Sequence, residues 1–247
     1  GPGPSDVCTV CHYHWHRPHT LRSVLRHTMT RRFKTVLFDL DGTLLDTAPD
    51  LANALNAALQ SNGRQPLPFD IIRPVVSHGG NALIELGFGL RPADPGFEPL
   101  RQELLDYYQN NIAQHTRLFP GMEEVLAYIE SHDLNWGVVT NKPGWLTKPL
   151  MDALHLSGRA AGIVSGDTLN ERKPHPAPLL HACRLIGTEP QQCLYVGDAE
   201  RDIQAGHNAG MVTLVALFGY LMENDRPETW GATAFISQPQ EILAWLS

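Results

Sequence analysis

Two carboxylates separated by a single residue, Asp39 and Asp41, follow a short apolar stretch and precede Gly42. The stretch, residues 35–38, is rich in β-forming side chains and predicts a buried strand. Because alternate side chains of an extended segment point the same way, both carboxylates should face one spot where the strand ends. Carboxylates so close repel each other unless a cation lies between them or one is protonated. The pattern predicts a metal site or a nucleophile paired with a general acid; an Asp-Gly turn is the alternative.

Three later apolar stretches, residues 134–140, 162–165 and 193–196, alternate with helical patterns. This alternation predicts an α/β protein with a Rossmann-like three-layer α/β/α core, in which helices cover both faces of a mainly parallel sheet. Ligands of such sheets bind at the carboxyl ends of the strands. The polar residues expected at that edge are Asp39, Asp41, Thr140, Asn141, Lys173, Asp198 and Asp202.

These residue types together suit phosphoryl transfer. Clustered carboxylate oxygens are ligands that Mg²⁺ prefers, and a cation, a hydroxyl and a lysine can hold the three oxygens of a phosphoryl group. One carboxylate can attack phosphorus and form an acyl phosphate, while the other protonates the leaving oxygen and later activates water. We therefore expect a Mg²⁺-dependent enzyme that hydrolyses a small phosphorylated metabolite.

Residues 47–117, between the first and second predicted strands, have helical periodicity and no strand pattern. An insert in this place is interpreted as an all-helical cap that covers the site. Its Gly-rich loop contains His78, Gly79, Gly80 and Asn81. The glycines would allow close approach to substrate, and His78 and Asn81 could hydrogen-bond a hydroxyl or a carboxylate of the substrate; a plain turn between helices is the alternative.

Composition limits the other function classes. The formal net charge of −7 argues against broad nucleic-acid binding, which needs a basic surface. No apolar run reaches the roughly 20 residues of a membrane span. The 4 cysteines do not form the pattern of a disulfide framework. We expect a cytoplasmic protein that does not bind a membrane and exists as a monomer or weak dimer.

The first 28 residues differ in character from the rest of the chain. The start Gly-Pro-Gly-Pro is similar to the remnant of a cleaved tag, so residues 1–28 are interpreted as a tag or a flexible N-terminal extension. Cys8 and Cys11 lie beside several histidines, so zinc binding is one alternative and a transit peptide is another. The core is then expected over residues 29–46 and 118–247, with the cap over residues 47–117.

Four segments, in chain order, resemble the motifs of the haloacid dehalogenase superfamily: Asp39-x-Asp41-Gly42-Thr43, Thr140, Lys173-Pro174 and Gly197-Asp198-x₃-Asp202. The helical insert is similar to the C1-type cap of that superfamily. The resemblance implies that Asp39 is the nucleophile and Asp41 the general acid and base, and that an aspartyl phosphate forms. It implies that Thr140 and Lys173 hold the phosphoryl oxygens, while Gly42 and Asn141 contact the substrate.

The same resemblance implies a Mg²⁺ ion bound by Asp39, by the backbone carbonyl oxygen of Asp41 and by Asp198. Asp202 would position either the waters of the ion or Lys173. An acid at position 41 is typical of the phosphatases of the superfamily and not of its dehalogenases.

Longer strings point to particular phosphatase families. Residues 38–50, 140–143 and 172–180 are similar to phosphoglycolate phosphatases, and the segments 218–220, 230–232 and 239–243 resemble bacterial N-acetylmuramic acid 6-phosphate phosphatases. Both resemblances imply a hydrolase of phosphomonoesters, with a place in carbohydrate metabolism. A phosphosugar mutase of the same superfamily is the first alternative, and a phosphate-binding module without catalysis is the second.

Overall fold

The computed structural model describes residues 31–247. The proposed N-terminal extension, its candidate zinc ligands and the expected start of the core at Met29 lie outside the described residues. Within residues 31–247, no helix has both the length and the apolar character needed to cross a membrane.

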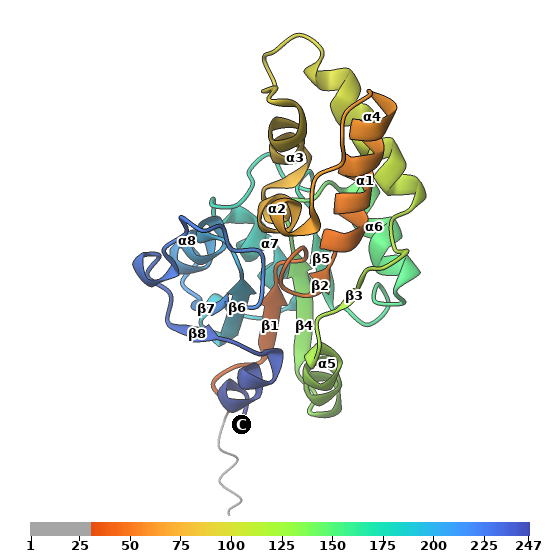
Figure 1. The fold of residues 1–247 in the computed structure, drawn as a ribbon. Coiled ribbons are helices and arrows are strands. Elements are labelled where there is room, and N and C mark those ends of the chain that lie inside the picture. Colours follow the sequence, from red (N-terminus) through yellow and green to blue (C-terminus); the bar gives the residue numbers. More distant parts are fainter. Residues whose placement is uncertain (1–30) are drawn as a thin grey trace, which may run out of the picture. The chain divides into compact units, whose positions relative to one another are not determined.

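A six-stranded sheet with the order β5-β4-β1-β6-β7-β8 forms the centre of the core, and every neighbouring pair is parallel (Figure 1). In the register, Phe38 lies opposite both Val138 and Val196, so β1, β4 and β6 end within one residue of the same level. Residues that follow these three strands are therefore neighbours, as the sequence predicts. The strands are β1 (Thr35–Phe38), β4 (Asn135–Val139), β5 (Gly162–Val164), β6 (Cys193–Gly197), β7 (Val212–Ala216) and β8 (Ala234–Ile236).

Helices cover both faces of the sheet. Alternate residues of β1 belong to different clusters, since Val36 and Phe38 pack in one and Leu37 in the other. This double burial explains why the strands read as continuous apolar runs, and it confirms the predicted three-layer core. On one face lie α5 (Met122–Ser131), α6 (Gly144–Ala153) and the 3₁₀ helix Pro239–Trp245, and on the other lie α7 (Ala177–Ile186) and α8 (Glu200–Asn208).

The chain between β1 and β4 contains the predicted cap, which is all-helical and lies above the sheet in Figure 1. Its helices are α1 (Ala48–Ser61), α2 (Phe69–Ile72), α3 (Gly79–Phe88) and α4 (Phe97–Asn110), with the 3₁₀ helix Arg73–His78 between α2 and α3. The chain enters through β2 (Leu45–Asp46) and returns through β3 (Arg117–Leu118), which form an antiparallel pair. The Gly-rich segment does open a helix, but Gly79 and Gly80, which are predicted to lie in the preceding loop, are themselves the first residues of α3.

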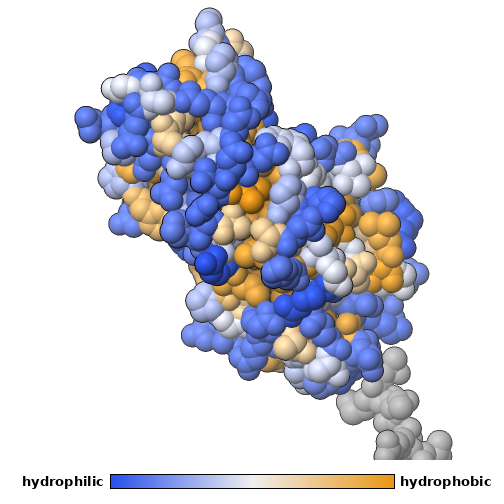
Figure 2. All heavy atoms as spheres, turned by 90° about the vertical axis from the view of Figure 1, so that its right-hand side faces the viewer, coloured by the Kyte–Doolittle hydropathy of each residue, from blue (hydrophilic) through white to orange (hydrophobic). Residues whose placement is uncertain are grey.

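The cap has its own apolar core. Helix α1 buries Leu51, Leu55 and Leu59, which are spaced four residues apart, and this face packs with residues of α4 such as Leu104. Polar and charged side chains cover most of the face shown in Figure 2, with apolar patches between them.

Buried Asp50 fixes the returning segment of the cap. Its Oδ2 accepts a hydrogen bond from the backbone N–H of Thr116 at 2.9 Å and another from the Thr116 hydroxyl at 2.8 Å, and the His115 N–H also donates to the carboxylate. Because Asp50 is on α1 and Thr116 directly precedes β3, these bonds hold the start and the end of the cap together.

Candidate active site

Asp39 and Lys173 form a buried ion pair at the end of β1. The Lys173 Nζ is 2.9 Å from Asp39 Oδ1 and 2.7 Å from Asp202 Oδ1, and it also donates to the Tyr195 hydroxyl and the Val139 carbonyl. Burial alone would lower the pKa of Lys173, but the charges of Asp202 and Asp39 raise it, so the ammonium group remains charged. Two carboxylates from distant parts of the chain thus share one fixed cation.

Asn141 positions the segment that carries Lys173. Its Nδ2 donates to the Lys173 carbonyl at 2.9 Å, and its Oδ1 accepts the Lys173 N–H at 3.0 Å. Both ends of the amide are therefore engaged with backbone. Asn141 was expected to contact substrate; it lines the cavity, but the contacts of its side chain give it a role in placing Lys173.

Asp41 has a lysine of its own. Its Oδ1 lies 2.9 Å from the Lys142 Nζ and accepts a hydrogen bond from the Thr47 hydroxyl at 2.6 Å. Thr140, which directly follows β4, is buried, and its hydroxyl accepts the Lys142 N–H at 3.1 Å. The two candidate catalytic carboxylates are therefore held separately, Asp39 by Lys173 and Asp41 by Lys142.

Asp39, Asp198 and Asp202 form a buried acidic cluster in which one carboxylate oxygen from each lies within 4.8 Å of the others. Burial and then the charge of Asp202 raise the pKa of Asp39 to about 6. Burial and then the charge of Asp39 raise the pKa of Asp198 well above its usual value. A buried cluster of three carboxylates, two of which have pKa values raised by burial and by nearby negative charges, fits a hard divalent cation.

The carboxylate oxygens of the acidic cluster differ in whether they already accept hydrogen bonds from protein groups. Asp202 accepts Lys173 at Oδ1 and the Ala199 N–H at Oδ2, at 2.7 and 3.0 Å, so both of its oxygens are engaged. Asp198 Oδ2 accepts the Ser77 hydroxyl at 2.7 Å, whereas its Oδ1 has only a long contact of 3.4 Å with Thr43. The carboxylates best placed to receive a cation are those of Asp39 and Asp198.

Gly42, which is predicted to contact substrate, is not among the residues that line the cavity with Asp39 and Asp41. Its N–H donates to the Leu45 carbonyl at 3.0 Å, and its φ is +83°. A Cβ at this position would lie 2.2 Å from Asp198 Oδ2. The position requires glycine because the chain turns in a left-handed conformation against a carboxylate of the cluster.

A cavity of about 320 Å³ lies between the core and the cap and contains Asp39, Asp41 and Thr140 on the core side. The four residues predicted to read the substrate, His78, Gly79, Gly80 and Asn81, all line it from the cap. The cationic side chains in the lining outnumber the two carboxylates, which favours an anion although the whole chain carries −7. These cations are Arg101, Lys142, Arg172 and Arg201.

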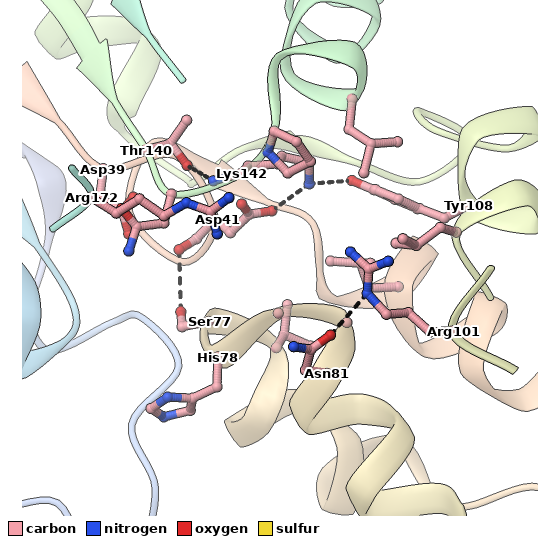
Figure 3. Close-up of a pocket in the computed structure, with 18 of the residues that line it drawn as sticks. Asp39, Asp41, Ser77, His78, Asn81, Arg101, Tyr108, Thr140, Lys142 and Arg172 are labelled. Atoms are coloured by element: carbon pink, nitrogen blue, oxygen red, sulfur yellow. Dashed lines mark hydrogen bonds and ion pairs between the residues drawn. The ribbon is translucent and has the colours of Figure 1, made fainter. Parts of the chain in front are cut away.

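The cap side of the cavity carries an arginine held by Asn81, as Figure 3 shows. The Arg101 Nε donates to Asn81 Oδ1 at 2.9 Å, and its Nη1 donates to Glu98 at 3.1 Å. Burial is the main cause that lowers the pKa of His78, so this ring is neutral at pH 7. Asn81, which is predicted to bind substrate directly, lines the cavity, and its carbonyl oxygen accepts the hydrogen bond from Arg101.

Sequence reasoning missed Arg101, Tyr108, Lys142, Arg172 and Arg201 as residues of this cavity. Lys142 and Arg201 carried a usable signal, because each lies within or beside a motif: Lys142 two residues after Thr140, and Arg201 directly before Asp202. Arg101 and Tyr108 carried none. Helical periodicity predicts only that one face of their helix is buried.

Comparison with known proteins agrees with this arrangement. The family model for haloacid dehalogenase-like hydrolases matches residues 36–216. An N-acetylmuramic acid 6-phosphate phosphatase from Pseudomonas putida is 43% identical, with 85% of this chain and 95% of that protein covered. A phosphoglycolate phosphatase from Xylella fastidiosa is 45% identical, with 83% of this chain and 90% of that protein covered. The crystal structure of a predicted phosphoglycolate phosphatase from Haemophilus somnus superimposes with a TM-score of 0.77 at 28% identity, and it covers 87% of this chain and 98% of that chain.

Proposed function

The chain belongs to the haloacid dehalogenase-like hydrolases, and we propose that it hydrolyses small phosphomonoesters through an aspartyl phosphate on Asp39, with Mg²⁺ as its cofactor. The observation that carries the proposal is the pairing of buried Asp39 with Lys173 beside Asp198, in a cavity with cationic walls. The relatives named as phosphatases support the reaction class.

Each residue of the site has a separate role in the proposed reaction. The Asp39 carboxylate attacks phosphorus, and the bond from phosphorus to the ester oxygen breaks. Asp41 gives a proton to that oxygen, which leaves as an alcohol, and later takes a proton from the water that attacks the aspartyl phosphate. Inorganic phosphate and the free Asp39 carboxylate result. Thr140 and Lys173 would hold the phosphoryl oxygens, and Lys173 offsets the charge of the nucleophile.

Mg²⁺ would be held by the carboxylates of Asp39 and Asp198 and by the backbone carbonyl oxygen of Asp41. When bound, it would neutralise charge on the phosphoryl group and on Asp39 as they approach. Asp202, whose oxygens are engaged with Lys173 and the Ala199 N–H, would act through Lys173.

Phosphate release from a panel of esters tests this function. With Mg²⁺ present, we expect turnover of p-nitrophenyl phosphate and faster turnover of phosphoglycolate or N-acetylmuramic acid 6-phosphate, because a cap that contacts substrate adds binding energy. A protein that releases phosphate from none of these esters would contradict the proposal. A sugar 1-phosphate in the panel distinguishes a phosphatase from the alternative, a phosphosugar mutase, since a mutase would yield an isomeric sugar phosphate in place of free phosphate.

The two relatives suggest a shared property of the substrate. Phosphoglycolate and N-acetylmuramic acid 6-phosphate, which their names identify, each carry a carboxylate besides the phosphate. Arg101 could bind such a carboxylate, because its Nη2 has no hydrogen-bond partner within residues 31–247 while Asn81 and Glu98 hold the rest of the guanidinium. We extend the proposal to a phosphomonoester that also carries a carboxylate.

Replacing Arg101 by Met should lower kcat/KM for N-acetylmuramic acid 6-phosphate about 10- to 100-fold, because a hydrogen bond to a charged group contributes about 1.5–3 kcal/mol. N-acetylglucosamine 6-phosphate lacks the 3-O-lactyl group, which carries the carboxylate, so its kcat/KM should change less than about threefold. Steady-state kinetics on this pair, and on phosphoglycolate beside ethylene glycol phosphate, measures the difference.

Arg91→Met is the matched control. Arg91 also belongs to the cap and also pairs with a glutamate, Glu85 at 3.1 Å, but its side chain is 76% exposed and does not line the cavity. Arg91→Met should leave kcat/KM unchanged for the esters with and without the carboxylate. Equal losses on the esters with and without the carboxylate would show that Arg101 only supports the cap.

A further inference from the structure

A buried lysine, Lys142, connects the candidate general acid to the cap. Its side chain is only 7% exposed, and its Nζ lies 2.9 Å from Asp41 Oδ1 and 2.7 Å from the Tyr108 hydroxyl. The same ammonium group stands 4.5 Å from the centre of the Tyr108 ring. Asp41 follows β1 of the core and Tyr108 belongs to α4 of the cap, so one charged group contacts both parts (Figure 3).

The side-chain contacts of Asp41 all involve the same carboxylate oxygen. Lys142 and the Thr47 hydroxyl both bind Oδ1, at 2.9 and 2.6 Å. Within residues 31–247, no hydrogen bond reaches Oδ2. Because two partners hold one oxygen, the carboxylate has a defined rotation, and Oδ2 is the oxygen available to a substrate in the cavity.

Tyr108 provides part of the environment of buried Lys142. The removal of an ammonium group from water costs several kcal/mol unless nearby groups compensate. Asp41 provides the opposite charge, and Tyr108 provides both a hydroxyl acceptor and an aromatic face. Burial, the largest cause, raises the pKa of Tyr108 to about 12, so the hydroxyl is neutral and can accept from Lys142. Movement of α4 away from the core would remove that acceptor and admit water to Lys142.

We infer that Lys142 is a positioning residue that couples closure of the cap, through Tyr108, to the orientation of Asp41. The inference rests on the proposed function, in which Asp41 is the general acid and base. With the cap closed, Lys142 holds Oδ1 and Oδ2 can give its proton to the leaving oxygen. With the cap open, Asp41 loses this restraint, so bond cleavage without a bound and enclosed substrate is disfavoured.

Leaving-group dependence separates this role from a structural one. An alkyl phosphate expels a poor leaving group and depends on the proton from Asp41, whereas p-nitrophenolate leaves without one. The kcat/KM value reports the steps up to formation of the aspartyl phosphate, so it excludes the later attack of water. A residue that orients Asp41 should therefore affect kcat/KM for alkyl esters and spare that for p-nitrophenyl phosphate.

We expect Lys142→Met to lower kcat/KM for phosphoglycolate or N-acetylmuramic acid 6-phosphate about 30- to 100-fold, part of the roughly 10²–10⁴-fold that general acid catalysis provides. Tyr108→Phe, which removes only the hydroxyl, should lower it about 5- to 10-fold. The loss of kcat/KM for p-nitrophenyl phosphate should be clearly smaller in both variants, about threefold or less, although Lys142→Met also removes one of the positive charges of the cavity wall. The double variant should be no worse than Lys142→Met alone, because Tyr108 acts through Lys142.

Two neighbouring residues provide matched controls. Lys148 lies on α6 and forms an exposed pair with Asp152, and Tyr107 lies beside Tyr108 with 40% of its surface exposed. Lys148→Met and Tyr107→Phe should retain wild-type kinetics on both classes of ester. Circular dichroism melting shows whether each variant is folded; should Lys142→Met fail to fold, Tyr108→Phe alone decides the outcome.

Equal losses of kcat/KM on alkyl esters and on p-nitrophenyl phosphate would overturn the inference, because they would show that Lys142 binds the phosphoryl group or only supports the fold. Unchanged kcat/KM for alkyl esters in both single variants would also overturn it. Additive losses in the double variant would overturn the coupling to the cap. A wild-type protein without activity on any ester would instead contradict the proposed function itself.

Discussion

Replacing Asp39 by Asn should reduce turnover of every phosphomonoester by about 10⁴-fold or more, because the loss of a nucleophile removes the entire covalent route. The amide has nearly the shape of the carboxylate but cannot attack phosphorus. The fold should persist. Burial raises the pKa of Asp39 to about 6, which means that the ionised form is the costly one in this site, so a neutral side chain relieves that cost at pH 7.

The measurement is phosphate release under saturating substrate, together with thermal melting of the purified variant. Mass spectrometry of the acid-quenched wild type should find the phosphoryl group on Asp39. Asp46→Asn is a suitable control, since Asp46 accepts the Tyr220 hydroxyl at 2.6 Å and does not line the cavity. Substantial turnover by the Asp39 variant, or a phosphoryl group on another residue, would assign the nucleophile elsewhere.

The core of the candidate site could be predicted because its residues lie at the ends of strands. A parallel sheet brings such ends to one edge whatever the lengths of the connections, so Asp39 and Asp198 meet although about 160 residues separate them. The i, i+2 spacing of Asp39 and Asp41 is a property of extended chain alone. Neither conclusion requires knowledge of side-chain packing.

The cap residues could not be predicted because their direction depends on how helices pack. Periodicity places Tyr108 on the buried face of α4, and only the crossing of α4 over the core decides that its hydroxyl meets Lys142, 34 residues away. The sequence predicts a Gly-rich loop that opens a helix at Gly79 and Gly80, because glycine favours turns and permits close approach. Here they occupy the first turn of α3, where they help to line the cavity.

Removal of divalent cations should abolish turnover, with a loss of about 10³-fold or more, because the phosphoryl group would then meet the negative charges of Asp39 and Asp198 while Lys173 is already shared between Asp39 and Asp202. Dialysis against EDTA followed by an assay in metal-free buffer measures the loss, and added Mg²⁺ should restore activity. Full turnover after complete removal of metal would contradict a metal-dependent mechanism. Recovery only with a different cation would change the identity of the cofactor.

Two carboxylate variants assign the ligands independently of activity. Mg²⁺ at about 100 times its dissociation constant should stabilise the folded wild type by about 2.7 kcal/mol, which raises its melting temperature. Asp198→Asn should lose this effect and show no Mg²⁺ binding by calorimetry, since Asp198 has an oxygen available to the ion. Asp202→Asn should keep Mg²⁺ binding within about threefold, because both Asp202 oxygens are engaged with Lys173 and the Ala199 N–H.

The Asp202 variant should instead have a lower melting temperature than the wild type in the absence of Mg²⁺, since Lys173 loses one of its two carboxylate partners in a buried site. Equal loss of Mg²⁺ binding in both variants would make Asp202 a direct ligand, and the division of the acidic cluster proposed above would be wrong.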